Sequence, residues 1–156
     1  MDSIETAEAS LPMALGEPAE PTDPTQLPGP GEPAGTEAEW PWETLRAEQE
    51  GRAGTFTDVM RHEYRWDEEG FTRLEEAMRA ACEALQGKTT IERWVGEGFW
   101  CWTAVIPELT SHPHFSTPDA TYLRRCLARL RDLGSWFFNG SSPYGPGHVW
   151  EPVRPA

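Results

Sequence analysis

The stretch DEEGFTRLEEAMRAACEALQ, residues 67–86, predicts the helix that decides the fold class. Its apolar residues recur at helical spacing, so they share one face of the helix. That face carries Phe71, Leu74, Met78, Ala81, Cys82 and Leu85. Glu68 and Glu69 suit the positive end of the helix dipole, and Gly87 suits a left-handed stop. We therefore expect a helix that is capped by Asp67 or a neighbour and ends near Gly87.

A second long helix is expected after the loop SHPHFSTP, residues 111–118. Thr117 is a suitable N-cap, and Pro118 fits the first helical position. The predicted buried stripe consists of Leu123, Cys126, Leu127, Leu130, Leu133 and Phe137. Gly140 is expected to end this helix. The chain beyond it is rich in Gly and Pro and is expected to be irregular, with Tyr144 and Trp150 pinning it onto the domain.

Residues 89–109 combine helix and strand signals. Thr89 and Glu92 form a capping-box pattern, and apolar residues then recur at helical spacing. Gly96 and Gly98 weaken the helix or allow close packing of a neighbouring element. The aromatic and β-branched run at 99–106 makes a strand the alternative. The sequence favours a helix that Pro107 interrupts or ends.

Two shorter elements precede these helices. Residues 40–52, WPWETLRAEQEGR, predict a short helix with Pro41 in its first turn. Residues 55–64 have helical spacing with Thr55 as cap, but they also alternate loosely enough to form a strand.

The resulting fold class is mainly α, a small helical bundle of about 3–5 helices behind a disordered N-terminal tail. The alternative is α+β with a short strand near 99–106. Residues 1–39 contain no aromatic residue, no Lys or Arg and seven prolines, so they are expected to form a disordered acidic tail. Residues 40–150 are expected to form a compact Trp-rich domain, followed by a C-terminal tail at 151–156.

The charge of the chain bears on its partners. Its formal net charge is −13, and the predicted tail carries −9 of it. Such a chain is repelled by nucleic-acid phosphates and by anionic membrane surfaces, so neither is an expected partner. A protein partner is expected, and a cationic one is favoured. Three widely spaced cysteines and the absence of a secretory signal favour the reducing cytoplasm.

The usual catalytic and cofactor motifs are missing, so we expect no cofactor, no catalytic residue and no enzyme activity. His112 and His114 are weak candidates for a metal site, since two imidazoles two residues apart can share an ion. Cys101 is a weaker candidate for a nucleophile that would need His112 or His62 as its base.

The aromatic and arginine content indicates a binding surface. Trp and Arg are enriched at interface hot spots, and eight tryptophans exceed the need of one small core. The predicted partner-binding residues are Trp94, Trp100, Trp102, Trp136, Phe138, Arg124, Arg125, Arg129 and Arg131. Of these, Trp100 and Trp136 are expected to lie off the buried stripes.

The functional expectation is a small acidic protein-binding module, of the inhibitor, immunity-protein or antitoxin type, from a bacterial genome. One alternative is a small metal-dependent or His/Cys-based enzyme. Another is an adaptor that docks through its tail, where Leu11, Met13 and Leu15 form an apolar island. The charge split further suggests that the tail docks onto the arginine-bearing helix and inhibits the module.

Overall fold

The computed structural model describes residues 40–116 and 118–155. They form a mainly helical fold, which confirms the predicted fold class. The elements are α1 (Trp42–Glu50), α2 (Phe56–His62), α3 (Glu68–Leu85), α4 (Arg93–Trp100), the π-helix η1 (Cys101–Val105), α5 (Ile106–Leu109) and α6 (Ala120–Asn139). The predicted tail, residues 1–39, lies outside the described residues.

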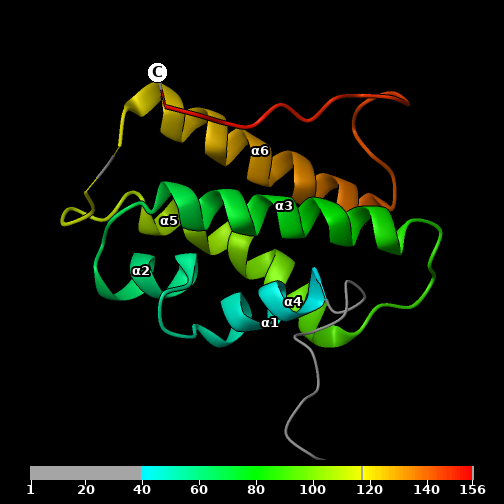
Figure 1. The fold of residues 1–156 in the computed structure, drawn as a ribbon, viewed down its shortest axis with the longest axis horizontal. Coiled ribbons are helices and arrows are strands. Elements are labelled where there is room, and N and C mark those ends of the chain that lie inside the picture. Colours follow the sequence, from blue (N-terminus) through cyan, green and yellow to red (C-terminus); the bar gives the residue numbers. More distant parts are fainter. Residues whose placement is uncertain (1–39, 117, 156) are drawn as a thin grey trace, which may run out of the picture. The chain divides into compact units, whose positions relative to one another are not determined.

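The long helix α3 lies in the middle of the fold, with α6 along one side and α1 on another (Figure 1). Helix α4 and the π-helix η1 connect the two sides, because α4 contacts α1 and both contact α6. After α6 the chain turns and runs back along that helix as an irregular C-terminal segment, residues 141–155 (Figure 1).

Aromatic side chains fill much of the core. The rings of Phe56 and Trp66 lie 4.9 Å apart, centroid to centroid, and Phe71 of α3 contacts both. On the other side of the core, Phe99 of α4 stacks on Phe137 of α6 at 3.9 Å. Edge-to-face pairs such as Phe56 with Trp66 and Phe71 add roughly 0.5–1.5 kcal/mol each beyond the apolar area that they bury.

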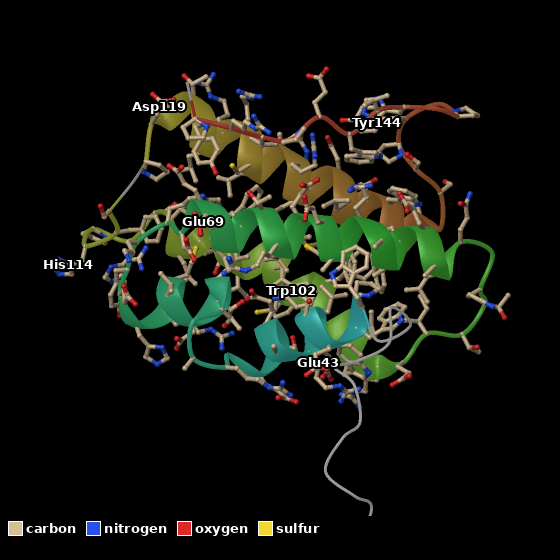
Figure 2. All side chains as sticks on the ribbon, in the orientation of Figure 1. Glu43, Glu69, Trp102, His114, Asp119 and Tyr144 are labelled. Carbon is tan, nitrogen blue, oxygen red and sulfur yellow. The ribbon has the colours of Figure 1, made fainter. Side chains whose placement is uncertain are left out.

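The segment that allowed either helix or strand is helical. Residues 99–106 run from the end of α4 through η1 into α5, and no strand occurs in the two described ranges. Trp102 of the π-helix lies inside the fold (Figure 2) and is fully buried. Its ring packs closely against Gly98. Pro107 does not end the helical path, which continues as α5 to Leu109. The π-helix η1 instead ends at Val105, two residues before the proline, which cannot donate a backbone hydrogen bond.

The sequence predicted the C-terminal ends of the helices better than their N-terminal ends. Gly87 and Gly140 both adopt the left-handed conformation at or just after a helix end, as predicted. The capping-box prediction is wrong, since α4 begins only at Arg93 and the Glu92 carboxylate accepts a hydrogen bond from Trp94 Nε1 instead. Thr117 lies outside the described residues, and α6 is capped by Asp119, which accepts from two backbone N–H groups.

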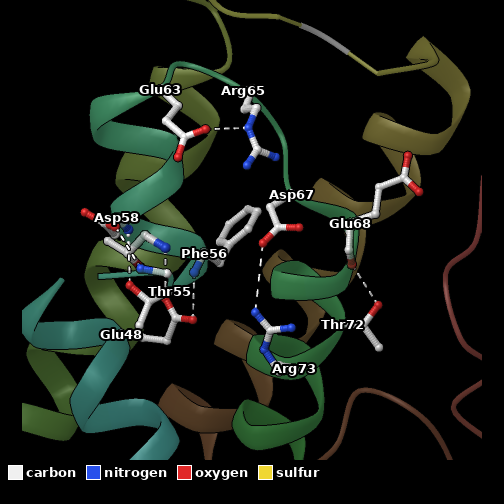
Figure 3. A network of polar contacts seen from close by, with 12 residues as sticks. Glu48, Thr55, Phe56, Asp58, Glu63, Arg65, Asp67, Glu68, Thr72 and Arg73 are labelled. Carbon is white, nitrogen blue, oxygen red and sulfur yellow. Dashed lines mark hydrogen bonds and ion pairs between the residues drawn. The ribbon is translucent and has the colours of Figure 1, made fainter. Parts of the chain in front are cut away.

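Helix α2 is confirmed with Thr55 as its cap, and a buried carboxylate from α1 reinforces its start. Glu48 accepts hydrogen bonds from the backbone N–H groups of Phe56 at 3.0 Å and Thr57 at 2.9 Å (Figure 3). These N–H groups lie in the first turn of α2 and have no partner within the helix. The contact therefore joins α1 to α2 by charge-assisted hydrogen bonds.

Candidate functional site

The predicted aromatic candidates divide into buried and exposed residues. Trp100 and Phe138 are 61% and 57% exposed, and Trp94 is half-buried. Trp102 is fully buried and Trp136 nearly so, which corrects their assignment to a partner surface. Trp102 lies in the π-helix and faces the core, and Trp136 is covered by Trp150 of the C-terminal segment.

Two adjoining apolar grooves lie around the connector between α3 and α4. The Trp94 groove is lined by Trp42, Arg46, Leu85, Lys88, Thr90, Ile91, Glu92, Trp94 and Val95. The Phe138 groove is lined by Cys82, Leu85, Gln86, Lys88, Ile91, Trp136, Phe137, Phe138, Asn139 and Gly140. Leu85, Lys88 and Ile91 line both grooves, so we refer to the two together as the Ile91 surface.

The Trp94 ring is fixed from two directions. Its indole Nε1 donates to Glu92 Oε2 at 2.7 Å, and the guanidinium carbon of Arg46 lies 4.3 Å from the ring centroid. A cation over an indole face at this distance is attracted by the ring quadrupole. Both contacts hold the ring in one orientation at the wall of its groove, which lowers the entropy lost when a partner covers it.

The Phe138 ring is positioned by the core beneath it. It meets Phe137 edge-on at 4.9 Å, and Phe137 in turn stacks on Phe99 of α4. Ile91 lies between this groove and the Trp94 groove and is itself 41% exposed. Residues far apart in the sequence, from α4, α6 and the connector before α4, therefore form one partly exposed apolar patch.

Little charge surrounds these grooves. Lys88 is the only lysine of the protein, and it makes no ion pair or hydrogen bond through its side chain with another described residue. Arg46 lies over Trp94, and Glu92 is occupied by the same ring. The Ile91 surface is thus mainly apolar, and the Lys88 side chain between its two grooves has no ionic partner among the residues that the structure describes.

Sequence reasoning missed Ile91, Lys88 and Trp42 as surface residues. The capping-box interpretation placed Ile91 inside a helix, on its buried stripe, whereas the connector extends to Glu92. One sequence feature could have indicated that Ile91 is exposed. It is an isolated isoleucine among Thr and Glu residues, in the connector that follows the left-handed Gly87.

The predicted arginine cluster separates into two parts. Arg125 and Arg129 hold the C-terminal segment, because Arg125 donates to the Arg154 carbonyl and Arg129 to the Glu151 carbonyl. Arg129 also forms an ion pair with Glu75 of α3 that is shielded from solvent.

The other two arginines, Arg124 and Arg131, are exposed and flank an apolar strip of α6. The strip and its flanks form the α6 outer face, which consists of Ala120, Leu123, Arg124, Leu127, Ala128 and Arg131.

The two histidines of the loop lie close together. The His112 and His114 rings have centroids 5.5 Å apart, and His112 stacks on Tyr64 at 5.1 Å. His114 lies at the outer end of the loop (Figure 2). Within residues 40–116 and 118–155, no group of three or more His, Cys, Asp and Glu side chains is placed to hold a metal ion.

The cysteines differ in environment. Cys82 and Cys126 are buried, and burial raises the pKa of each thiol to about 12. Cys101 is partly exposed in the π-helix, where Arg61 Nη2 lies 3.5 Å from its sulfur. The contact of Cys101 with Arg61 does not provide the base that a nucleophilic cysteine needs.

Comparisons with known proteins give no family. No family model matches the chain, and no curated protein or solved structure is significantly similar to it. In the part of the chain that the structure describes, no helix has the length and apolar character needed to cross a membrane.

Proposed function

We propose that this chain is a protein-binding module and that the Ile91 surface is its contact surface. The observation that carries the proposal is the convergence of Trp42, Ile91, Trp94 and Phe138 around two adjoining grooves. Aromatic anchors held in rigid, partly buried positions are the side chains that dominate binding energy at protein interfaces.

The expected partner presents large apolar side chains to the grooves. A helix suits this geometry, because residues at i, i+3, i+4 and i+7 form an apolar stripe that fits a groove. The net charge of −13 steers the encounter toward a cationic protein, while the contact itself is apolar. Within this proposal, the chain neutralises its partner in the manner of an inhibitor, immunity protein or antitoxin.

The proposed site of action is the cytoplasm. The described domain holds three free cysteines, two of them buried in the core. Free thiols persist in reducing compartments, where disulfides are rare.

The test compares matched surface variants in affinity capture from the native host at physiological salt. Ile91→Ser/Phe138→Ser removes two exposed apolar side chains of the surface without changing charge. Val149→Ser is the control, since Val149 is an exposed apolar residue that lines neither groove. We expect one protein to be retained by wild type and by the control, and its affinity to fall about tenfold or more for the double variant.

Two further measurements make the result decisive. Urea unfolding of all three proteins checks that the double variant keeps its fold, and titration of the purified partner gives each Kd. Equal affinity of the double variant and the control, or no partner retained by wild type, would contradict the proposal.

A further inference from the structure

Lys88 lies between the two grooves of the Ile91 surface. Its side chain is exposed and lines both of them. The backbone N–H of Lys88 donates to the Leu85 carbonyl at 2.9 Å, directly after the left-handed Gly87. The turn that ends α3 therefore fixes the backbone from which the ammonium group extends. A partner that fills both grooves must pass over this side chain.

The Ile91 surface is opposite in charge to the chain as a whole. Among the described residues that line it, Arg46 and Lys88 are cationic and Glu92 is anionic, which gives a net charge of +1. The chain has a net charge of −13. Arg46 and Glu92 both contact the ring of Trp94, whereas the Lys88 side chain has no ion pair or hydrogen bond with another described residue. The uncompensated charge of the surface is therefore that of Lys88.

The position of this charge determines what a partner must supply. A partner seated in both grooves removes water from the ammonium group of Lys88. Burying a charged group without a counter-charge is costly, and a carboxylate opposite the ammonium group offsets that cost. A neutral or cationic group at the same place leaves the ammonium group unpaired. The surface therefore discriminates in favour of partners that carry an acid there.

We infer that the segment bound by the Ile91 surface carries an acidic residue between two large apolar side chains. The carboxylate pairs with Lys88, and the apolar side chains enter the Trp94 groove and the Phe138 groove. In a helical segment, residues spaced by three or four positions share one face and can supply all three groups. This inference rests on the proposed function and adds the chemistry of the partner's docking segment.

The inferred acid is compatible with a partner that is cationic overall. The net charge of −13 acts at long range and favours the approach of a cationic protein. Lys88 acts only at contact, where it selects the residue that meets it.

The same charge argues against a second copy of this chain as the occupant. A symmetric dimer through the Ile91 surface would bring the same patch of both copies together. Two linings of net charge +1, each with an unpaired Lys88, would then face each other. Like charges at an interface are unfavourable, so a different protein is the better match.

The first test selects binding peptides with the full-length chain as bait. A displayed library of short helical peptides is selected in parallel against wild type and against Lys88→Glu. For wild type, we expect Asp or Glu to be enriched between two apolar positions. For Lys88→Glu, we expect Lys or Arg at that same position. No acidic enrichment with wild type, or no selected peptide, would overturn the inference.

The second test measures the Kd of a selected acidic peptide and of its copy with the acid replaced by the corresponding amide. Lys88→Met removes the charge but keeps an apolar stem, and it should weaken the acidic peptide about tenfold while leaving the amide copy almost unchanged. Arg124→Met is the matched control, because Arg124 is also exposed and unpaired among the described residues but lines neither groove. Equal losses for both peptides with Lys88→Met would overturn the inference.

The same assay separates this inference from the proposed function. If Ile91→Ser/Phe138→Ser abolishes peptide binding but Lys88→Met has no effect, the inference fails and the proposed surface stands. Peptide binding that survives the double variant contradicts the proposed function and the inference together. Urea unfolding checks each variant, and Lys88→Gln replaces Lys88→Met if the latter is unstable.

A vesicle experiment distinguishes a protein carboxylate from a lipid phosphate. The full-length chain is sedimented with vesicles of phosphatidylcholine that contain phosphatidylglycerol. We expect no binding, because the net charge of −13 is repelled by an anionic surface. Sedimentation that depends on Lys88 would assign the surface to an anionic membrane and overturn the inference.

Discussion

The indole rings of Trp136 and Trp150 lie nearly parallel, 5.7 Å apart, and this stack joins the C-terminal segment to α6. The guanidinium carbon of Arg129 lies 4.8 Å from the centroid of the Trp150 ring. The Tyr144 hydroxyl donates to Asp132 of α6 at 2.6 Å. An aromatic layer therefore holds a segment that has no regular secondary structure of its own, as the sequence predicted for Tyr144 and Trp150.

The first prediction concerns this layer. Trp150→Ala should lower the free energy of unfolding by about 2 kcal/mol, less than the roughly 3–5 kcal/mol of a fully buried tryptophan, because Trp150 is half-buried. Urea unfolding measures the change. Val149→Ala is the control, since this side chain is 74% exposed and should change stability by less than about 0.5 kcal/mol. Equal effects of the two substitutions would show that the stack is not stabilising.

The second prediction concerns the carboxylate at the start of α2. Glu48→Gln replaces one of two accepting oxygens by an amide that cannot accept from the N–H of Phe56 or Thr57. A buried N–H group then lacks a partner, so unfolding free energy should fall by about 1–3 kcal/mol. Glu50→Gln is the matched control, because Glu50 is exposed and, among the described residues, pairs only with Arg52. Its effect should stay below about 1 kcal/mol, and a loss as large as that of Glu48→Gln would contradict the prediction.

Sequence periodicity predicted α3 and α6 well because each has a long apolar face that no local signal opposes. The C-terminal stops were equally clear, since Gly87 and Gly140 adopt the left-handed geometry that glycine permits. The N-terminal caps were less predictable, because several polar residues near each start can accept the free N–H groups. Asp119 caps α6, and Glu92 bonds to an indole rather than to the start of α4.

The candidate surface was only partly accessible to sequence reasoning. Trp100 is exposed as predicted, since it lies on the outer side of α4. Trp136 was expected to be exposed but is buried, because the ring that covers it belongs to an irregular segment without periodicity. The Ile91 surface combines residues of different elements, and only the tertiary arrangement brings them together.

The third prediction concerns the reactivity of the thiols. Burial raises the pKa of Cys82 and of Cys126 to about 12, so both are protonated and shielded at pH 8. A thiol reagent should therefore modify Cys101 quickly in the folded protein and the other two only after unfolding. Mass spectrometry of the labelled peptides gives the site, and Cys101→Ser should abolish the fast phase. Fast labelling of Cys82 or Cys126 would contradict the predicted burial.

The same pKa shifts predict a pH dependence of stability. An unfolded thiol ionises near pH 8.5, whereas the folded ones hold their protons to about pH 12. The buried thiols contribute their full stabilisation at pH values below the pKa of the unfolded thiol. The free energy of unfolding then falls as the pH rises from about 8.5 toward 12. Burial raises the pKa of Tyr122 as well, so the comparison is made against Cys126→Ala, whose slope should be smaller. An identical slope would show that Cys126 does not contribute.

The last prediction uses two glycines of α4 that differ in their surroundings. A β-carbon added at Gly96 would meet no atom within 4 Å, whereas one at Gly98 would lie 2.7 Å from the buried ring of Trp102. Alanine is favoured over glycine inside a helix by about 1 kcal/mol, so Gly96→Ala should raise the free energy of unfolding by about that amount. Gly98→Ala has the same gain in propensity, but the fully buried Trp102 ring has no room to move. The cost of such overpacking is about 1–3 kcal/mol, so this substitution should lower stability.

Urea unfolding of the two glycine variants beside wild type checks the predicted difference in sign. In a third variant, Gly98→Ala/Trp102→Leu, the smaller side chain at 102 relieves the contact. This double variant should therefore lose less stability than the sum of the losses of Gly98→Ala and Trp102→Leu measured separately. Stabilisation by Gly98→Ala would mean that the Trp102 ring does not pack against this turn.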